Sequence, residues 1–334
     1  MGYRSLFLAL ALSAWAFCGS TGCRAEGERA RGDSRLTLMC WNAQTFFDAT
    51  DDGREFREFR GAKSGWGQER YVCRLDRLRE AILLAGEELG CGIERGPDLV
   101  VLQEIESERV LRDLANRMPR RSQYRYIGFV PPAAGCSFGC AVLSRCPIRS
   151  VTAHATESSS GRPEGSGLRP LLRLGIDTGL GPITLFAFHW KSKAGDTEAE
   201  DEAASRCRAA QEALLAREMS RASEGGSCVI ACGDANQTLD ESRSLGTFDC
   251  AWESWLGLVE AGAVPGPEGS YLHEGAWETI DQIWYAGNIE LADFRVLSRT
   301  PFVDVRGTPA RYSVYSGVGY SDHLPLVAAF ARHD

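Results

Sequence analysis

Several polar residues in this chain stand where long apolar runs stop, and their types can do chemistry. They end three such runs and mark one segment near the carboxyl terminus: Glu104, His189, Asp234, Asn236, Asp322 and His323. Strands that end on carboxylates, imidazoles and an amide can bring these groups together in one site. Hard oxygen ligands combined with histidine suit metal-assisted hydrolysis of phosphoesters. We therefore expect a phosphoester hydrolase with a divalent cation.

Each of these side chains suits a particular task in that chemistry. Histidine titrates near neutral pH, so His323 is the best candidate for a general base or a transition-state stabiliser. A carboxylate can bind Mg²⁺ or Mn²⁺ while water and phosphate fill the other positions, which makes Glu104 the leading metal ligand. Gly233 permits a tight turn that presents Asp234 and Asn236. Asp234 could position or deprotonate the attacking water and Asn236 could orient it, so the identity of the base stays open.

The elements that must position these residues can be read from apolar periodicity and turn residues. Strands are expected at residues 36–41, 99–102, 124–130, 139–144, 148–153, 171–176, 183–188, 228–232, 279–286, 289–297 and 324–330. Helices are expected at residues 68–89, 110–118 and 197–221, and loops at 48–67 and 156–167. Many strands without regular βαβ alternation favour two packed sheets with helices outside.

Seven stretches of the sequence carry a resemblance to a known family. They are Met39–Asp48, Leu102–Glu104, Ala141–Ile148, Phe188–Lys193, Gly233–Asn236, Ile280–Ile283 and Ser321–His323. In these stretches and in their order the chain resembles the endonuclease/exonuclease/phosphatase superfamily, which has the DNase I-like fold. The resemblance implies an α/β fold, namely a four-layer α/β sandwich of two packed mixed β-sheets flanked by helices. It also implies phosphoester hydrolysis that depends on Mg²⁺, with Mn²⁺ or Ca²⁺ as possible replacements.

The resemblance also assigns roles to individual residues. Asn42 would hold the metal or a coordinated water through its amide oxygen, together with Glu104 and Asp322 as metal ligands. Asp281 matches the family aspartate that orients His323, and a carboxylate on one ring nitrogen fixes the tautomer of the imidazole. The full catalytic set implied in this way is His189, Asp234, Asn236, Asp281 and His323.

Phosphate contacts are expected from the segment that follows the predicted strand at 183–188. His189 would donate to a non-bridging phosphate oxygen or aid the leaving group. The neighbouring donors predicted to bind phosphate are Lys191, Ser192 and Lys193. The chain departs from the family at two positions. Gln44 stands where some relatives have an acid, and Gln282 stands where relatives often carry histidine or tyrosine.

The amino-terminal residues predict export rather than a part of the fold. Residues 1–22 read as a signal peptide, because the apolar stretch 6–17 is too short to span a bilayer as a mature helix. The small residues before Cys23 resemble a bacterial lipoprotein signal with Cys23 as the lipidated residue, and a plain secretory signal is the alternative. Residues 23–34 read as a flexible tether, and residues 35–334 as a single domain.

Composition limits the functions that are open to the chain. The net charge of -8 argues weakly against an extended nucleic-acid-binding face, but a metal site can still attract one phosphate. Cys40, Cys228 and Cys232 lie in apolar runs and are expected to be buried thiols. We expect an exported nuclease that cleaves DNA or RNA, either membrane-anchored through its lipid or free in the periplasm or medium. A phosphodiesterase or phosphatase acting on lipid headgroups or inositol phosphates, and a non-catalytic binding lipoprotein, are the alternatives. No protein partner is predicted.

Overall fold

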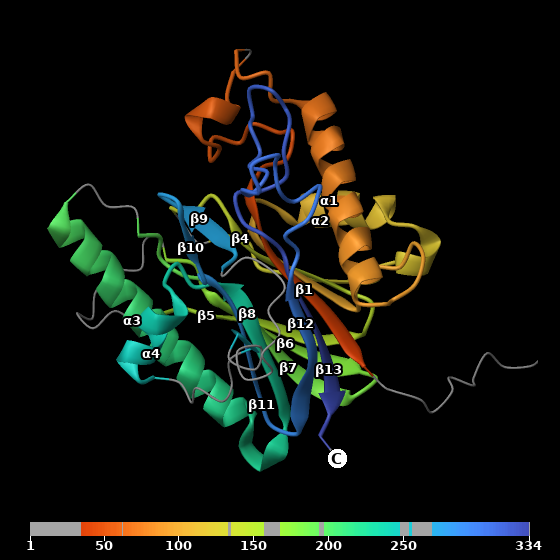
Figure 1. Ribbon diagram of the computed structural model, residues 1–334, viewed down its shortest axis with the longest axis vertical. Helices are drawn as coiled ribbons and strands as arrows, with labels where there is room; N and C mark the ends of the chain where they lie inside the picture. The colour runs from red at the N-terminus through yellow and green to blue at the C-terminus, as the bar shows by residue number, and fades with distance from the viewer. Residues whose placement is uncertain are drawn as a thin grey trace, which may run out of the picture. The chain divides into compact units, whose positions relative to one another are not determined.

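Two mixed β-sheets pack face to face at the centre of the protein, and helices cover their outer faces (Figure 1). The computed structural model describes residues 35–61, 63–132, 135–156, 168–193, 197–247, 254–255 and 269–333. All of these residues belong to one compact unit. The predicted signal peptide, the tether with Cys23 and most of the predicted loop at 156–167 lie outside the described residues.

The first sheet has six strands in the order β12-β13-β1-β2-β4-β3. Their bounds are β1 (Leu36–Phe46), β2 (Leu99–Ile105), β3 (Tyr126–Phe129), β4 (Gly139–Ser144), β12 (Ile289–Val296) and β13 (Leu326–Arg332). β1 pairs in parallel with β2 and antiparallel with β13. These three central strands are almost continuously buried, which is why their sequences read as apolar runs rather than as alternating patterns.

The second sheet has five strands in the order β11-β8-β7-β6-β5. Their bounds are β5 (Ile148–His154), β6 (Leu171–Thr178), β7 (Gly181–His189), β8 (Cys228–Asp234) and β11 (Asp281–Ala286). A separate hairpin consists of β9 (Tyr271–His273) and β10 (Ala276–Glu278), which the sequence did not predict. β7 and β8 run in parallel, so their carboxyl ends reach the same edge of the sheet.

Helices pack on the outer face of each sheet. The helices are α1 (Gln68–Glu88), α2 (Glu108–Arg117), α3 (Glu198–Ala222) and α4 (Leu239–Leu245), with short 3-10 turns at Arg57–Phe59, Arg120–Ser122 and Glu224–Gly226. α1 and α2 contact strands of the first sheet, and α3 contacts β8 of the second. The predicted four-layer, DNase I-like α/β sandwich is therefore confirmed, while α4 was not foreseen.

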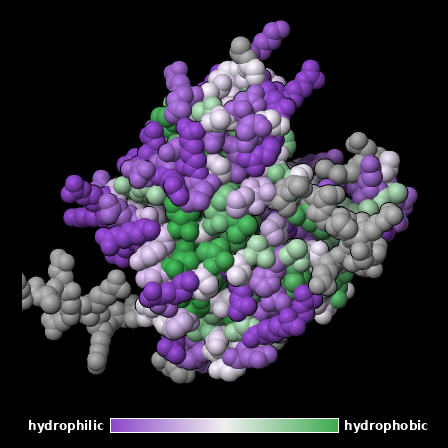
Figure 2. Space-filling model, turned by 180° about the vertical axis from the view of Figure 1, so that it is seen from behind, coloured by the Kyte–Doolittle hydropathy of each residue, from purple (hydrophilic) through white to green (hydrophobic). Residues whose placement is uncertain are grey.

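Hydrophobic residues are concentrated between the layers. Cys40, Cys228 and Cys232 are buried free thiols, as their apolar surroundings predicted. On the face shown in Figure 2, hydrophilic side chains cover most of the surface and hydrophobic ones gather near the middle. Within the described ranges, no helix has the length and apolar character needed to cross a bilayer.

Candidate active site

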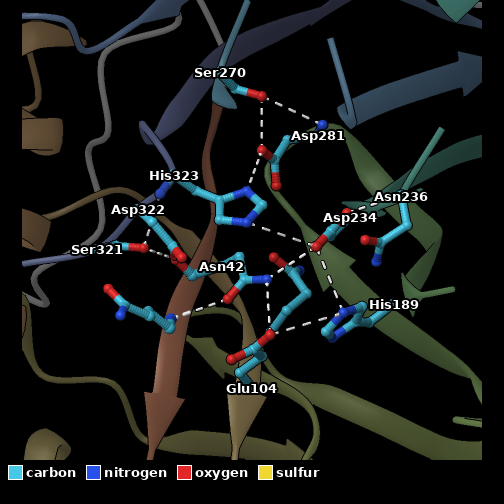
Figure 3. A network of polar contacts seen from close by, with 12 residues as sticks. Asn42, Glu104, His189, Asp234, Asn236, Ser270, Asp281, Ser321, Asp322 and His323 are labelled. Atoms are coloured by element: carbon cyan, nitrogen blue, oxygen red, sulfur yellow. Dashed lines mark hydrogen bonds and ion pairs between the residues drawn. The ribbon is translucent and has the colours of Figure 1, made fainter. Parts of the chain in front are cut away.

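The strand registers bring the predicted polar residues together from both sheets. In the second sheet, Asp234 at the end of β8 is paired with His189 on β7 and with Asp281 on β11. In the first sheet, Asn42 on β1 is paired with Gln103 on β2, next to Glu104. Figure 3 shows these side chains pointing toward one another between the two sheets. The structure therefore brings the strand-end polar groups together, as the sequence suggested.

His323 is the end of a short chain of hydrogen bonds. Its Nδ1 lies 2.8 Å from Oδ2 of Asp281, and the same oxygen accepts a hydrogen bond of 2.6 Å from the Ser270 hydroxyl (Figure 3). Burial alone would lower the pKa of the imidazole, but the nearby carboxylates of Asp281 and Asp234 raise it to about 10. The arrangement fixes the tautomer and favours the imidazolium, with Nε2 directed at Asp234.

Asp234 occupies the centre of the cluster and is almost fully buried. Its Oδ2 lies 3.9 Å from Nε2 of His323 and accepts a hydrogen bond of 2.9 Å from Nδ2 of Asn42. Its Oδ1 accepts the backbone N–H of Asn236 at 2.8 Å. Burial raises the pKa of Asp234 to about 7, although the charge of His323 opposes the rise. This carboxyl group can therefore change its protonation state near neutral pH.

His189 approaches the same carboxylate from the other side. Its Nε2 lies 3.5 Å from Oδ2 of Asp234 and 3.9 Å from Oε1 of Glu104. Burial, and then the charges of Arg169 and His323, hold the pKa of this imidazole well below its usual range. Its Nδ1 is buried and has no hydrogen-bond partner among the residues that the structure describes. His189 is thus a neutral imidazole beside a charged one.

The backbone that carries Glu104 adopts an uncommon conformation. Glu104 has a φ of 62°, and the segment facing it has positive φ at Gln44 and Thr45, 50° and 46°. Buried Arg74 donates hydrogen bonds to the carbonyl oxygens of this segment, at 2.8 Å for Thr45 and 2.9 Å for Ala43. The backbone N–H of Thr45 in turn donates to Oε2 of Glu104. Non-glycine residues in this region are strained, and such strain is often found at functional sites.

The donor set around Glu104 fits a hard divalent cation. Nδ2 of Asn42 donates hydrogen bonds to Oε1 of Glu104 at 3.3 Å and to Oδ2 of Asp234 at 2.9 Å, so both carboxylates face this side chain. The amide oxygen, which was predicted to hold the metal, instead accepts the backbone N–H of Gln44 at 2.9 Å. Asn42 therefore orients the two carboxylates and is not placed as a metal ligand. The Glu104 side chain is 19% exposed, which leaves it open to the cleft. Asp322 also lines the cleft, where its Oδ2 lies 3.8 Å from Nε of Arg311. Carboxylate oxygens such as those of Glu104 and Asp322 can hold Mg²⁺, Mn²⁺ or Ca²⁺.

A second way of grouping possible ligands is less suited to an ion. One ligand atom from each of Asp234, Asp281 and His323 lies within 4.8 Å of the other two. However, Asp281 already shares a hydrogen bond with His323 and another with Ser270. Those bonds occupy Nδ1 of His323 and Oδ2 of Asp281, while Oδ1 of Asp281 is buried without a hydrogen-bond partner among the described residues. The His323–Asp281 pair is thus arranged as a hydrogen-bonded imidazolium and carboxylate, whereas Glu104 is the carboxylate that is open to the cleft.

The structure places the predicted phosphate-binding residues unequally. Ser192 and Lys193 line the cleft, and Nζ of Lys193 also forms an ion pair of 2.9 Å with Glu241. Lys191 is not among the lining residues; its backbone N–H donates to Gln211 at 2.9 Å. Asn236 lines the cleft, although its Nδ2 donates to a backbone carbonyl oxygen at 3.2 Å.

Several residues of the site had not been recognised in the sequence. The Tyr271 ring lies 4.7 Å from the His323 ring, and Ser270 supports Asp281. Ser321 donates to the backbone oxygen of Asn42 at 2.7 Å, which ties the His323 loop to β1. Only Ser321 had a local signal, because it belongs to the Ser-Asp-His motif. The others come from segments whose pattern gave no reason to place them near β8.

Glu104, His189, Asp234, Tyr271 and His323 line one open cleft with a volume of about 1090 Å³. Charged side chains on its walls include Glu58, Arg169 and Arg311, and aromatic ones include Tyr312 and Tyr315. A cleft of this size is larger than most sites for a single small molecule. The buried cluster lies at one part of the wall, so an extended substrate could reach it without being enclosed.

Solved structures similar to this chain come from animals and bacteria. The chain is 16% identical to truncated Caenorhabditis elegans TDP2, with 89% of this chain and 97% of that chain covered and a TM-score of 0.57. It is also 16% identical to D. rerio TDP2 complexed with single strand DNA product. That match covers 89% of this chain and 99% of the other, with a TM-score of 0.58. For the human Nocturnin catalytic domain with bound sulfate the identity is 17%, the coverage 89% and 94%, and the TM-score 0.53. At these identities the likeness shows the fold alone.

Sequence comparison identifies the family directly. No functionally curated protein sequence matches the chain significantly. In contrast, the sequence profile of the Endonuclease/Exonuclease/phosphatase family matches residues 39–323, a span that contains every residue of the cluster. Membership of this family accounts for both the two-sheet fold and the convergence of acid, amide and imidazole groups. The chain belongs to the Endonuclease/Exonuclease/phosphatase family.

Proposed function

We propose that the chain is an exported, divalent-metal-dependent nuclease that cleaves phosphodiester bonds of DNA or RNA. The observation that carries this proposal is the position of Asp234, buried between the imidazoles of His189 and His323 and bridged to Glu104 through Asn42. Family membership supports phosphoester hydrolysis. The donor chemistry around Glu104 supports a divalent cation as the cofactor.

The geometry suggests how the chain's own groups share the work. Asp234 would orient the attacking water and accept its proton on Oδ2, since a carboxyl pKa of about 7 suits a base at neutral pH. His323, held as an imidazolium by Asp281, would stabilise negative charge on the phosphate oxygens. A bound divalent cation would add further neutralisation of that charge and of the leaving oxygen. Of the two roles considered for His323, its raised pKa favours stabiliser over base.

The walls of the cleft favour a nucleic acid as substrate. Arg169 and Arg311 line the cleft and can form ion pairs with phosphates. Tyr315 is 70% exposed and offers a ring on which a base can stack. The net charge of -8 means that these contacts would act locally rather than across a broad basic face. The similar zebrafish protein was crystallised with a single strand DNA product.

A substrate panel tests the proposal. Folded mature protein, stripped of metal and then supplied with Mg²⁺, Mn²⁺ or Ca²⁺, is incubated with single-stranded DNA, double-stranded DNA, RNA, sphingomyelin and inositol phosphates. We expect cleavage of a nucleic acid with at least one cation, and none by a Glu104→Gln variant. Release of phosphocholine or inorganic phosphate without nucleic-acid cleavage would replace the nuclease by a headgroup or inositol phosphoesterase. Inertness toward the whole panel would reject catalysis.

Export and lipidation form a separate part of the proposal and rest on sequence alone. Cys23 follows small residues and an apolar stretch that resemble a bacterial lipoprotein signal. In a bacterial host we expect the full-length chain in the membrane fraction, because one acyl-modified cysteine would anchor it. A Cys23→Ser variant should move to the soluble exported fraction. Identical fractionation of the two forms would contradict lipidation at this residue.

A further inference from the structure

We propose a second divalent-cation site, suited to Ca²⁺, formed by Asp52, Glu55 and Glu106 between the β1–α1 loop and the end of β2. One carboxylate oxygen from each of these residues lies within 4.8 Å of the other two. Three acids from two distant segments thus meet at one point. The site shares no residue with the catalytic cluster, and the proposal does not depend on the proposed nuclease activity.

An unsatisfied carboxylate oxygen points to a ligand at this place. Glu106 is buried, with only 2% of the residue exposed. Its Oε2 accepts the backbone N–H of Asp48, at 2.6 Å, but Oε1 is buried and receives no hydrogen bond from any described residue. A buried carboxylate oxygen without a donor is costly, and a coordinated cation removes that cost.

The negative charge of the carboxylates around Glu106 also favours a bound cation. Glu55, which is only 4% exposed, accepts the backbone N–H groups of Asp52 and Gly53 at 2.8 and 2.9 Å, so the loop is folded around this carboxylate. Arg54 neutralises Asp52 on the exposed side of the cluster, where both side chains reach solvent. Arg60 approaches Glu55 only to 3.9 Å. These contacts leave the inner carboxylate, Glu106, as the group that most needs a positive charge.

The ligands match Ca²⁺ in chemistry and spacing. Ca²⁺ takes six to eight oxygen ligands at about 2.3–2.6 Å, so oxygens on opposite sides of one ion are about 5 Å apart. Oxygens within 4.8 Å of one another can therefore all contact a single ion. Carboxylates carried by two loops also suit the flexible geometry of Ca²⁺, whereas Mg²⁺ requires a near-ideal octahedron and keeps several waters.

A cation here would fix one wall of the catalytic cleft. Phe56, Glu58 and Phe59, which directly follow Glu55, line that cleft, and Phe59 packs against Phe47 with ring centroids 4.8 Å apart. Glu106 itself lies immediately after β2, the strand that carries Glu104. Binding at the second site would thus order the loop without any contact with the substrate, and its loss would affect the shape of the cleft.

Terbium luminescence tests the site, because Tb³⁺ replaces Ca²⁺ and is excited by nearby indoles. The Trp66 indole donates to the backbone oxygen of Asp48 at 2.8 Å, which places it beside the cluster. The titration uses the full mature chain in a Glu104→Gln background, so that the catalytic cation does not contribute. We expect saturable luminescence that Ca²⁺ displaces better than Mg²⁺, and a higher Tm when Ca²⁺ is present.

Matched second substitutions decide the outcome. Adding Glu106→Gln or the exposed Asp52→Asn should weaken Tb³⁺ affinity by about tenfold or more and abolish the Ca²⁺-induced rise in Tm. Adding Glu58→Gln, in the same loop but outside the cluster, should leave both unchanged. If Glu106→Gln unfolds the protein, Asp52→Asn alone decides. Equal Tb³⁺ affinity in the single and double variants, or no displacement by Ca²⁺, would overturn the proposed site.

Discussion

The two imidazoles of the site differ in charge because their neighbours differ. His323 hydrogen-bonds to Asp281 and is held as an imidazolium, whereas His189 is buried without a partner on Nδ1 and stays neutral. Asp234, between them, faces a charge on one side and a neutral hydrogen-bonding group on the other. In the proposed reaction, this asymmetry would let Asp234 accept a proton while His323 stabilises charge on the phosphate.

We expect the charged members of this cluster to be needed for turnover. His323→Ala and Asp234→Asn should each lower the turnover number by roughly a hundredfold or more, because each removes a proton acceptor or a charge from the reacting centre. Glu58→Gln, on the cleft wall but outside the cluster, is the matched control and should retain near-normal rates. Circular dichroism verifies the fold. Near-wild-type rates in both cluster variants would reject the assignment.

The outer members of the hydrogen-bond chain should contribute in graded steps. Asp281→Asn removes the charge that holds His323 as an imidazolium, and we expect a loss of about tenfold or more in the turnover number. Ser270→Ala removes only one hydrogen bond to Asp281, worth about 1 kcal/mol, and should cost less. Steady-state kinetics on the cleaved substrate compares the two. A larger loss for Ser270→Ala than for Asp281→Asn would contradict this order.

At the scale of elements, the parallel pairing of β7 and β8 decides where His189 and Asp234 meet. Gly233, one residue before Asp234, lies against β7 so closely that an added Cβ would stand 1.9 Å from the Phe188 carbonyl oxygen. The glycine is therefore required by packing between strands. The sequence had suggested instead that Gly233 provides a turn, but it lies inside the buried strand β8.

Replacement of Gly233 by alanine should consequently force the two strands apart. We expect Gly233→Ala to lower the free energy of unfolding by about 1–3 kcal/mol. It should also reduce activity, because Asp234 directly follows Gly233 and His189 directly follows Phe188 on the neighbouring strand. Gly179→Ala is the matched control, because a Cβ there meets nothing within 4 Å. Urea denaturation measures the difference. An equal effect of the two substitutions would show that the close approach does not matter.

Apolar runs were sufficient to predict most strands and the two-layer arrangement, because burial leaves a direct record in composition. They could not predict the register that aligns Asp281 with Asp234, since register depends on contacts between distant strands. The hairpin β9–β10 is short and partly exposed, so it left no periodic pattern, and α4 spans only Leu239–Leu245. Arg74, which holds the strained Thr45 segment, was read only as part of a helix.

At the scale of the whole molecule, both sheets contribute to one site. Asn42 and Glu104 come from the first sheet, while His189, Asp234 and Asp281 come from the second. Neither sheet alone carries a full set of cation ligands, base and charge stabiliser. The packing of the two layers is therefore what creates the site, and activity and global folding should be lost together in denaturant.

The most direct measurement is the cation dependence of oligonucleotide cleavage by wild type and Asp234→Asn side by side. Metal-stripped protein is mixed with a fluorescent single-stranded DNA or RNA, and Mg²⁺ or Mn²⁺ is added back in steps. We predict no cleavage without cation, saturable recovery in wild type, and a rate lower by roughly a hundredfold in Asp234→Asn at every concentration. Cleavage that survives chelation, or equal rates in the two proteins, would contradict a metal-assisted site centred on Asp234.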